Sequence, residues 1–472
     1  MGDQVTTMDR LTAEDQLMLW PDEIWPQDIG ALAVLDGGAL LDPDGQVRIA
    51  AVRRAVEARL HLVPRFRQLL CVPGRWLGPP LWVDAPVFDV ADHVGVVPLP
   101  APGDEATLLR TVERLRRRRL DRSRPLWEMR LLAGMPDNRV GLFIRMHHAM
   151  ADGIAGVAAA SALLDAGAAT PLAVPPPWTP VPAPTRRDLL ADNLRRHIST
   201  LGRAFSVLAR PVAAARRLSA AWPAMRELMA EEHGPGTSLN RMVGPDRRFA
   251  LVRTSVDVVK QVAHGYGATV NDVLLAATAG GLRALLRSRG EPVDDLAVRV
   301  YVPVTLRRGQ LGRARGNLIS QMVVPLPLGG SDPGRRLTQI AVETAARKAR
   351  SRPSLGSLFR SRIIRRAFLR AANRHPVNVT TADLPGPMAP VNLVGARVLE
   401  VFPVLPLIAN VSLGVGALSY SGQLTITVVA DGDGYPDLDV FVAGLRDELR
   451  ALGAVAPVSS RPSAARSVAR RG

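Results

Sequence analysis

The apolar positions of the chain follow two periods, which predicts an α+β protein. Residues 140–146 and 249–252 are apolar and suit strands, whereas residues 154–164 and 271–287 favour helices. Between residues 190 and 208, apolar side chains recur every three or four positions with arginines between them, which predicts a basic amphipathic helix. The apolar run 401–418 is interrupted by Pro, Asn and Gly, so we expect two buried strands joined by a turn rather than a membrane span.

A proline-rich segment divides the chain into two halves of similar size. Residues 171–184 include seven prolines in fourteen positions, which is typical of an extended linker. We therefore expect an N-terminal domain over residues 1–170, a linker with the basic helix over 171–240, and a C-terminal domain over 241–452. The Ser-, Ala- and Arg-rich tail 453–472 is expected to be disordered.

Composition narrows the class of protein. With 47% apolar and 22% charged residues, the 472-residue chain is expected to fold as a globular protein. Cys71 is the single cysteine, which excludes an intramolecular disulfide and a thiolate zinc cage. The first residues lack the basic and apolar regions of a signal peptide. These features favour a cytoplasmic protein.

The net charge of +17 indicates an anionic partner. Nucleic acid, anionic lipid and the phosphates of a coenzyme are the physical candidates. Aromatic residues make up only 4% and do not alternate with basic ones, so we expect no nucleic-acid binding. The basic segment 347–374 has an apolar stripe, so it is either a solvated helix packed by that stripe or a contact for membrane or coenzyme phosphates.

The clearest chemical feature is His147-His148-Ala149-Met150-Ala151-Asp152-Gly153, placed between an expected strand and an expected helix. Adjacent side chains on a strand point to opposite faces, so one histidine would face a cavity and the other the interior. This disfavours a two-histidine metal site, and no HExxH spacing is present, so we expect no metal. A single imidazole base fits best. Asp152 would cap the helix and help orient the base, and Gly153 would let the backbone turn closely.

These residues, with several others, resemble the bacterial wax ester synthase/diacylglycerol acyltransferase family, within the HHxxxDG superfamily of coenzyme A-dependent acyltransferases. Residues 120–128 read LDRSRPLWE and include the PLW element, and residues 271–276 read NDVLLA, close to the family's NDVVLA. Further matches lie at residues 64–67, 82–84, 302–307 and 385–387, so the resemblance spans residues 9–452 in family order. Two departures are Ala382-Asp383, where the family usually has Ser-Asn, and Arg119 in place of a proline, which we expect to be harmless.

The resemblance implies two chloramphenicol-acetyltransferase-like domains, with mixed β-sheets and flanking helices, that enclose a central tunnel. It also implies transfer of a long-chain acyl group from acyl-CoA to the hydroxyl of diacylglycerol, or of a fatty alcohol. His148 would be the general base, and His147, Asp152 and Gly153 would complete the catalytic motif. Acyl-CoA would be a co-substrate, with no resident cofactor and no covalent acyl-enzyme. One reaction centre per chain is expected, because the second half lacks HHxxxDG.

Substrate contacts are expected at Pro125, Leu126 and Trp127 of the PLW element and at Asn271 and Asp272. Each has a structural alternative: Trp127 could be a core aromatic, and Asn271 or Asp272 could simply start a helix. Asn271 is also a candidate donor to the developing oxyanion, by family position.

Two further functions stay open at this point. The chain could be another HHxxxDG acyltransferase, such as a condensation-like domain with a different hydroxyl or amine acceptor, or a catalytically idle lipid-binding homologue. The basic helices favour a peripheral position on the inner face of the plasma membrane or on lipid droplets.

Overall fold

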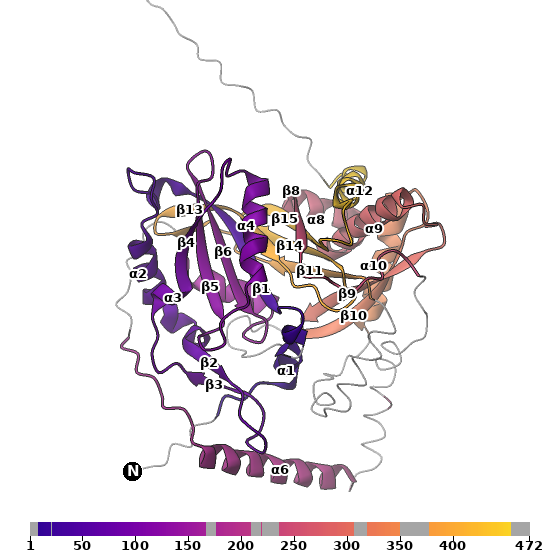
Figure 1. Cartoon of the computed structure of the whole chain (residues 1–472). Coiled ribbons are helices and arrows are strands. Elements are labelled where there is room, and N and C mark those ends of the chain that lie inside the picture. Colours follow the sequence, from indigo (N-terminus) through magenta and orange to yellow (C-terminus); the bar gives the residue numbers. More distant parts are fainter. Residues whose placement is uncertain are drawn as a thin grey trace, which may run out of the picture.

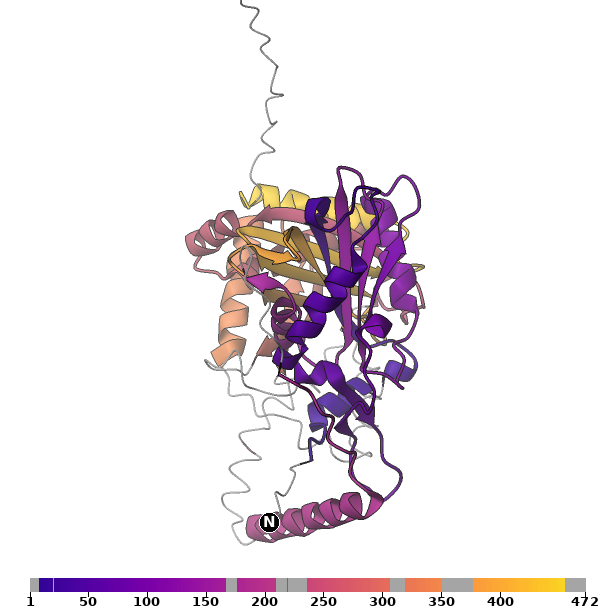
Figure 2. The same ribbon diagram turned by 90° about the vertical axis from the view of Figure 1, so that its left-hand side faces the viewer.

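The computed structural model describes residues 8–19, 21–166, 176–208, 219, 236–305, 319–349 and 377–454. Figure 1 shows two mixed β-sheets side by side, with helices packed against each of them. The helix α6 (Arg186–Leu208) lies away from both sheets, at one end of the molecule (Figures 1 and 2).

The first sheet has the strand order β4-β5-β6-β1-β13-β12-β7. Strands β4 and β5 pair in parallel, and the other neighbours are antiparallel. The strands are β1 (Asp28–Asp36), β4 (Val94–Pro98), β5 (Trp127–Ala133), β6 (Arg139–His147), β7 (Asp165–Ala166), β12 (Val391–Leu393) and β13 (Ala396–Val404). The C-terminal half of the chain therefore supplies two strands to this sheet.

Alternation along β1 divides its side chains between two apolar cores, as expected for a strand buried on both faces. Ile29, Ala33 and Leu35 face the core that includes α2 (Ile49–Arg59). Leu32 and Val34 face the core that includes α4 (Glu105–Arg117). The other elements of this half are α1 (Ala13–Leu19), η1 (Pro21–Glu23), η2 (Gly37–Ala39), η3 (Leu60–Leu62), η4 (Pro64–Arg67), β2 (Gln68–Cys71), β3 (Leu81–Asp84), α3 (Val90–His93) and α5 (Gly153–Ala162).

The second sheet has the strand order β10-β9-β11-β14-β15-β8. Strand β11 is parallel to both neighbours, and the other pairs are antiparallel. Its apolar core includes side chains of each helix that the structure describes in this half. The elements are β8 (Arg247–Ser255), α8 (Val256–Gly265), α9 (Val270–Ser288), β9 (Ala297–Thr305), β10 (Ile319–Pro327), α10 (Pro333–Ala349), β11 (Val379–Pro385), β14 (Leu413–Tyr420), β15 (Gln423–Asp431) and α12 (Leu438–Ala451).

The two-domain α+β fold predicted from the sequence is confirmed, and the enclosed tunnel stays a prediction. The expected strand 249–252 lies within β8 and the expected helix 271–287 within α9. The apolar run 401–418 forms the end of β13 and most of β14, but these strands belong to different sheets and are not a hairpin.

The basic amphipathic helix is present as α6. Most of the basic segment 347–374 and of the tail 453–472 lies outside the described residues, which end at 349 and 454 in these regions. Among the helices that the structure describes, none has both the length and the apolar character needed to cross a membrane.

Candidate active site

The two histidines of the motif lie where β6 ends. The backbone N–H of His147 donates to the carbonyl of Leu126, which precedes β5, over 2.9 Å. The backbone N–H of His148 donates in the opposite direction, to the carbonyl of Gln27 before β1, over 2.7 Å. The His147 side chain is buried and that of His148 is half-buried. The alternation expected at the end of a strand therefore separates their roles.

Asp152 and Gly153 begin helix α5. The Asp152 carboxylate accepts a hydrogen bond of 2.8 Å from the backbone N–H of Ala155, so Asp152 is the helix N-cap that the sequence predicted. Gly153 does not adopt a left-handed conformation, so a tight turn does not explain it. A Cβ atom at Gly153 would lie 2.9 Å from Cδ2 of Leu384 on β11. The missing side chain instead lets a strand of the second sheet approach α5.

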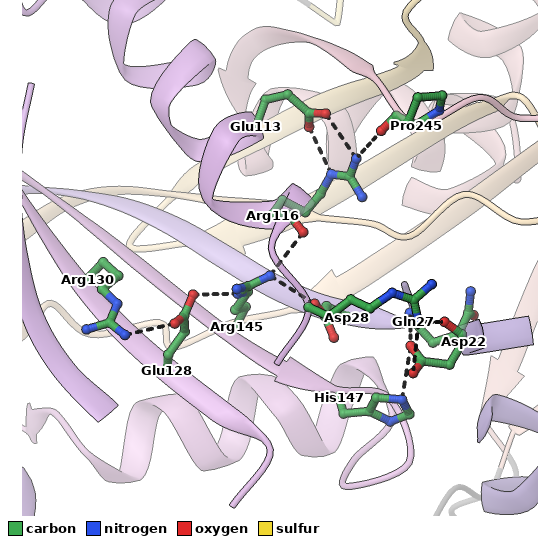
Figure 3. Close-up of polar contacts among 11 residues, drawn as sticks. Asp22, Gln27, Asp28, Glu113, Arg116, Glu128, Arg130, Arg145, His147 and Pro245 are labelled. Atoms are coloured by element: carbon green, nitrogen blue, oxygen red, sulfur yellow. Dashed lines mark hydrogen bonds and ion pairs between the residues drawn. The ribbon is translucent and has the colours of Figure 1, made fainter. Parts of the chain in front are cut away.

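The ring of His147 is hydrogen-bonded at Nδ1 and lies beside a carboxylate at Nε2. Its Nδ1 accepts a hydrogen bond of 3.0 Å from the backbone N–H of Ala149, which places the proton of the neutral ring on Nε2. That Nε2 lies 3.3 Å from Oδ1 of Asp22, as Figure 3 shows. The ring of His147 therefore lies between the backbone of Ala149 and the carboxylate of Asp22.

Asp22 is itself tightly held. Its carboxylate accepts hydrogen bonds of 2.9 Å from the backbone N–H of Gln27 and of 2.8 Å from Nη2 of Arg122. Burial raises the pKa of Asp22, but the interactions with His147, Gln27 and Arg122 outweigh burial and hold the pKa well below its ordinary value. Asp22 is thus a stable anion beside His147.

A buried ion network continues from this point along β1, β5 and β6 (Figure 3). Arg145 donates to Asp28 over 3.0 Å, to Glu128 over 2.6 Å and to the carbonyl of Arg116 over 3.1 Å. Burial raises the pKa of Asp28 to about 6, although the charge of Arg145 acts against this rise. The network ties together the strands whose ends carry the histidine motif.

His148 has the protonation state that a general base needs. Burial lowers the pKa of its imidazole. The ring is therefore neutral near pH 7 and able to accept a proton.

One small cavity adjoins the motif, and a second lies beside the start of the PLW element. One of about 100 Å³ is lined by Leu126 and His147 together with Asp22, Pro26, Asp28, Arg119, Leu120 and Arg122. The other, of about 220 Å³, includes Pro125 in its lining, together with Phe88, His93 and Arg124. The structure thus brings Leu126 to the motif itself and places Pro125 in a neighbouring cavity.

Trp127 lies in the core of the first domain. Its side chain is 1% exposed and its indole N–H donates to the carbonyl of Phe66 over 2.9 Å. Its ring stacks on Phe66 and His93, at centroid distances of 4.7 and 4.6 Å. These contacts account for Trp127 as a core aromatic, and a role in substrate binding stays a prediction.

Asn271 and Asp272 lie in the first turn of α9, in the second domain. Thr269 caps this helix, and Asp272 closes a capping box with Thr269. The second carboxylate oxygen of Asp272 accepts a hydrogen bond of 2.7 Å from the Thr344 hydroxyl on α10. The helix-start alternative therefore explains Asp272, whereas the half-buried Asn271 remains a candidate for substrate contact.

Several polar residues of the site were not predicted. Asp22, Asp28, Glu128 and Arg145 come from four separate segments, and no local spacing signals their meeting. The guanidinium of Arg119, which stands in place of a proline and was expected to be harmless, donates to the carbonyls of Asp22 and Glu23. Within the described residues, no group of three or more His, Cys, Asp or Glu side chains is arranged to hold a metal ion.

Comparison with known proteins settles the family. Residues 11–274 match the family model described as the wax ester synthase/diacylglycerol acyltransferase catalytic domain, and residues 315–453 match the WS/DGAT C-terminal domain. The chain belongs to the wax ester synthase/diacylglycerol acyltransferase family. The protein is therefore an acyltransferase of that family.

Among its family relatives is a probable diacylglycerol O-acyltransferase of Mycobacterium tuberculosis, 31% identical over 440 residues, which cover 90% of this chain and 91% of the relative. A wax ester synthase/diacylglycerol acyltransferase from Marinobacter aquaeolei has a similar structure, with a TM-score of 0.65 at 24% identity, covering 94% of this chain and 98% of that one. A starter condensation domain of rhizomide synthetase, solved with C8-CoA and Leu-SNAC, has a TM-score of 0.60 at 16% identity, covering 97% of each chain.

Proposed function

We propose that this acyltransferase moves a long-chain acyl group from acyl-CoA to the free hydroxyl of diacylglycerol, which forms triacylglycerol. A fatty alcohol is the alternative acceptor and would give a wax ester. The observation that carries the proposal is a neutral, half-buried His148 beside a His147 whose ring is fixed by Asp22. The names of the family relatives support diacylglycerol as acceptor.

In the proposed reaction His148 accepts the proton of the acceptor hydroxyl. The oxygen attacks the carbonyl carbon of the thioester and forms a C–O bond. The tetrahedral intermediate then collapses, the C–S bond breaks, and the CoA thiolate takes the proton from His148. Because Nδ1 of His148 is buried while the side chain as a whole is half-buried, the hydroxyl would approach the Nε2 side. A positioned base of this kind contributes about 10²- to 10⁴-fold to the rate.

His147 and Asp22 act as positioning residues in this scheme. The two nitrogens of His147 face Ala149 and Asp22, so the ring holds the end of β6 in place. Asp152 fixes the start of α5 directly after the motif. The attack needs no enzyme nucleophile and no covalent acyl-enzyme, so acyl-CoA is the donor and no resident cofactor takes part. Asn271 is the proposed donor to the oxyanion.

The solved condensation domain with C8-CoA supports acyl-CoA as the donor, since the two proteins share a fold. We place the protein in the cytoplasm, peripheral on the inner face of the plasma membrane or on lipid droplets, where both proposed acceptors are concentrated.

The experiment that tests the proposed function is an acceptor panel. Purified full-length protein is incubated with radiolabelled palmitoyl-CoA and either diacylglycerol, monoacylglycerol, hexadecanol or a long-chain amine, and the labelled lipids are separated. Triacylglycerol as the main product supports the proposal. Wax ester as the main product would mean that the acceptor is a fatty alcohol and not diacylglycerol. An amide as the main product would favour a condensation-like acceptor. No labelled lipid with any acceptor would favour a lipid-binding homologue without activity.

The pH profile gives a separate test of the base. Burial lowers the pKa of His148 from its ordinary value near 6.5, so protonation removes the base only below that pH. The acid limb of kcat/KM should therefore have its midpoint below pH 6.5. A midpoint above this value would mean that His148 is not the group that titrates.

A further inference from the structure

Helix α6 lies apart from the two sheets, yet it is fixed at its N-terminal half (Figures 1 and 2). Its Leu189 is buried against Leu77 and Leu81 of the β2–β3 ribbon. Asp192 accepts a hydrogen bond of 2.9 Å from Arg10, and the Asn193 side chain donates 2.8 Å to the carbonyl of Trp76. These contacts set the rotation of the helix about its own axis.

The other side of α6 carries an exposed apolar row. Leu190, Leu194, Ile198 and Leu201 have exposed fractions of 47%, 61%, 61% and 59%. Their spacing of four, four and three residues places them on one face, because residues three and four apart lie side by side on a helix. At about 100° per residue, this face lies on the far side of the helix from Leu189 and Asp192, and Asn193 lies between the two faces. The fixed rotation therefore directs the apolar row away from the β2–β3 ribbon.

Basic side chains frame this row. Arg186 and Arg195 lie along its two edges, and Arg187 lies at its first turn; all three are exposed. The two acidic residues of the helix have other partners. Asp188 accepts a hydrogen bond from the Thr185 hydroxyl at the start of the helix, and Asp192 forms an ion pair with Arg10. Trp76, 78% exposed, lies at the tip of the β2–β3 ribbon beside the helix. An aliphatic row, an exposed indole and a positive rim together match the boundary between acyl chains and anionic headgroups.

We propose that the apolar row of α6, with its arginine rim and Trp76, is the surface that docks this protein onto an anionic lipid membrane. A second copy of the chain is a poorer occupant, because face-to-face packing would bring two arginine-rimmed rows together. The proposal deepens the proposed function, because it names the surface through which the enzyme would meet its lipid acceptor.

The test uses full-length protein and sedimentation with vesicles of phosphatidylcholine, with or without phosphatidylglycerol, at low salt. Wild type should bind the anionic vesicles and bind neutral ones less well. Leu194→Glu with Ile198→Glu should lower the bound fraction about tenfold or more, because it places two charges on the apolar row. The matched control, Ser199→Glu with Thr200→Glu, adds the same charge on the other side of α6 and should stay within about threefold of wild type. Trp76→Ser should weaken binding.

Several results would overturn the proposal. One is wild-type protein that stays in the supernatant with anionic vesicles. Another is a Leu194/Ile198 variant that binds as well as wild type, and a third is an equal loss of vesicle binding in both double variants. A wild-type dimer in solution that the Leu194/Ile198 variant dissociates would assign the row to a second copy instead. Unchanged thermal unfolding of the variants serves as the folding control, because the substituted side chains are exposed.

Activity separates this proposal from the proposed function. With a short-chain diacylglycerol dissolved as monomers, the Leu194/Ile198 variant should keep kcat/KM within about twofold of wild type; with acceptor in anionic vesicles it should lose about tenfold. If no variant and no wild-type protein transfers acyl groups in either assay, the proposed function fails, and the sedimentation result still decides the docking surface. Equal loss in both assays would contradict docking by this row.

Discussion

Asp383 gives a prediction that can be worked out from the structure in detail. It lies on β11, next to the Leu384 that contacts Gly153, and stands where family members usually have asparagine. Burial raises the pKa of Asp383 to about 6 from 3.8, although the charge of Lys348 acts against the rise. We predict that Asp383→Asn stabilises the protein at neutral pH.

The sign follows from proton binding. The folded protein holds the Asp383 proton more tightly than the unfolded chain, so this contribution to stability is complete below pH 3.8 and is lost as the pH rises through about 6. A rise of about two pKa units corresponds to about 3 kcal/mol, and the partial solvent exposure of the side chain reduces this to about 1–3 kcal/mol. Since asparagine does not titrate, the gain should be largest at pH 8 and nearly absent near pH 4.

The assay is urea unfolding of both proteins across this pH range, followed by tryptophan fluorescence. Asp295→Asn, which removes an exposed carboxylate, is the matched control and should give a difference that stays within about 0.5 kcal/mol at every pH. A stabilisation of Asp383→Asn that does not depend on pH would refute the reasoning, as would destabilisation at pH 8.

Three further predictions concern stability, each measured by urea unfolding. Trp127→Phe should cost about 1–3 kcal/mol, because the buried carbonyl of Phe66 loses its donor; no loss would contradict the core role of the indole. Asp152→Ala should cost about 1 kcal/mol through the lost cap of α5, and Asp152→Asn should recover most of it; an Asn variant as unstable as Ala would argue against capping. Arg145→Met should cost about 3–5 kcal/mol, because two carboxylates lose their buried partner; a neutral effect would mean that the network is dispensable.

Local features of the fold could be predicted from the sequence. The period of the apolar residues marked the strand in β8 and the helices α5, α6 and α9, because such patterns depend on neighbours a few positions away. The pairing of β13 with β1 could not be predicted, since it joins residues more than 350 positions apart and depends on tertiary contacts. For the same reason the two strands expected in the run 401–418 could be predicted, but not that they enter different sheets.

The candidate site likewise combines features that follow from neighbouring residues with features that depend on tertiary contacts. The alternation of His147 and His148 and the cap at Asp152 follow from adjacent residues, and both were predicted. Asp22, which lies beside the ring of His147, is 125 positions earlier in a short 3-10 helix. No local sequence pattern marks it as part of the site. Gly153 was expected to serve a turn, but only the position of Leu384 on β11 reveals that it makes room for the second sheet.

The most direct test of the account is the rate of acyl transfer from labelled palmitoyl-CoA to diacylglycerol by wild type, His148→Ala and His264→Ala. His264 is an exposed histidine of α8 and serves as the matched control. The account predicts that His148→Ala lowers kcat/KM by at least about a hundredfold, while His264→Ala leaves it unchanged. A His148→Ala protein as active as wild type would contradict the assignment of His148 as the general base.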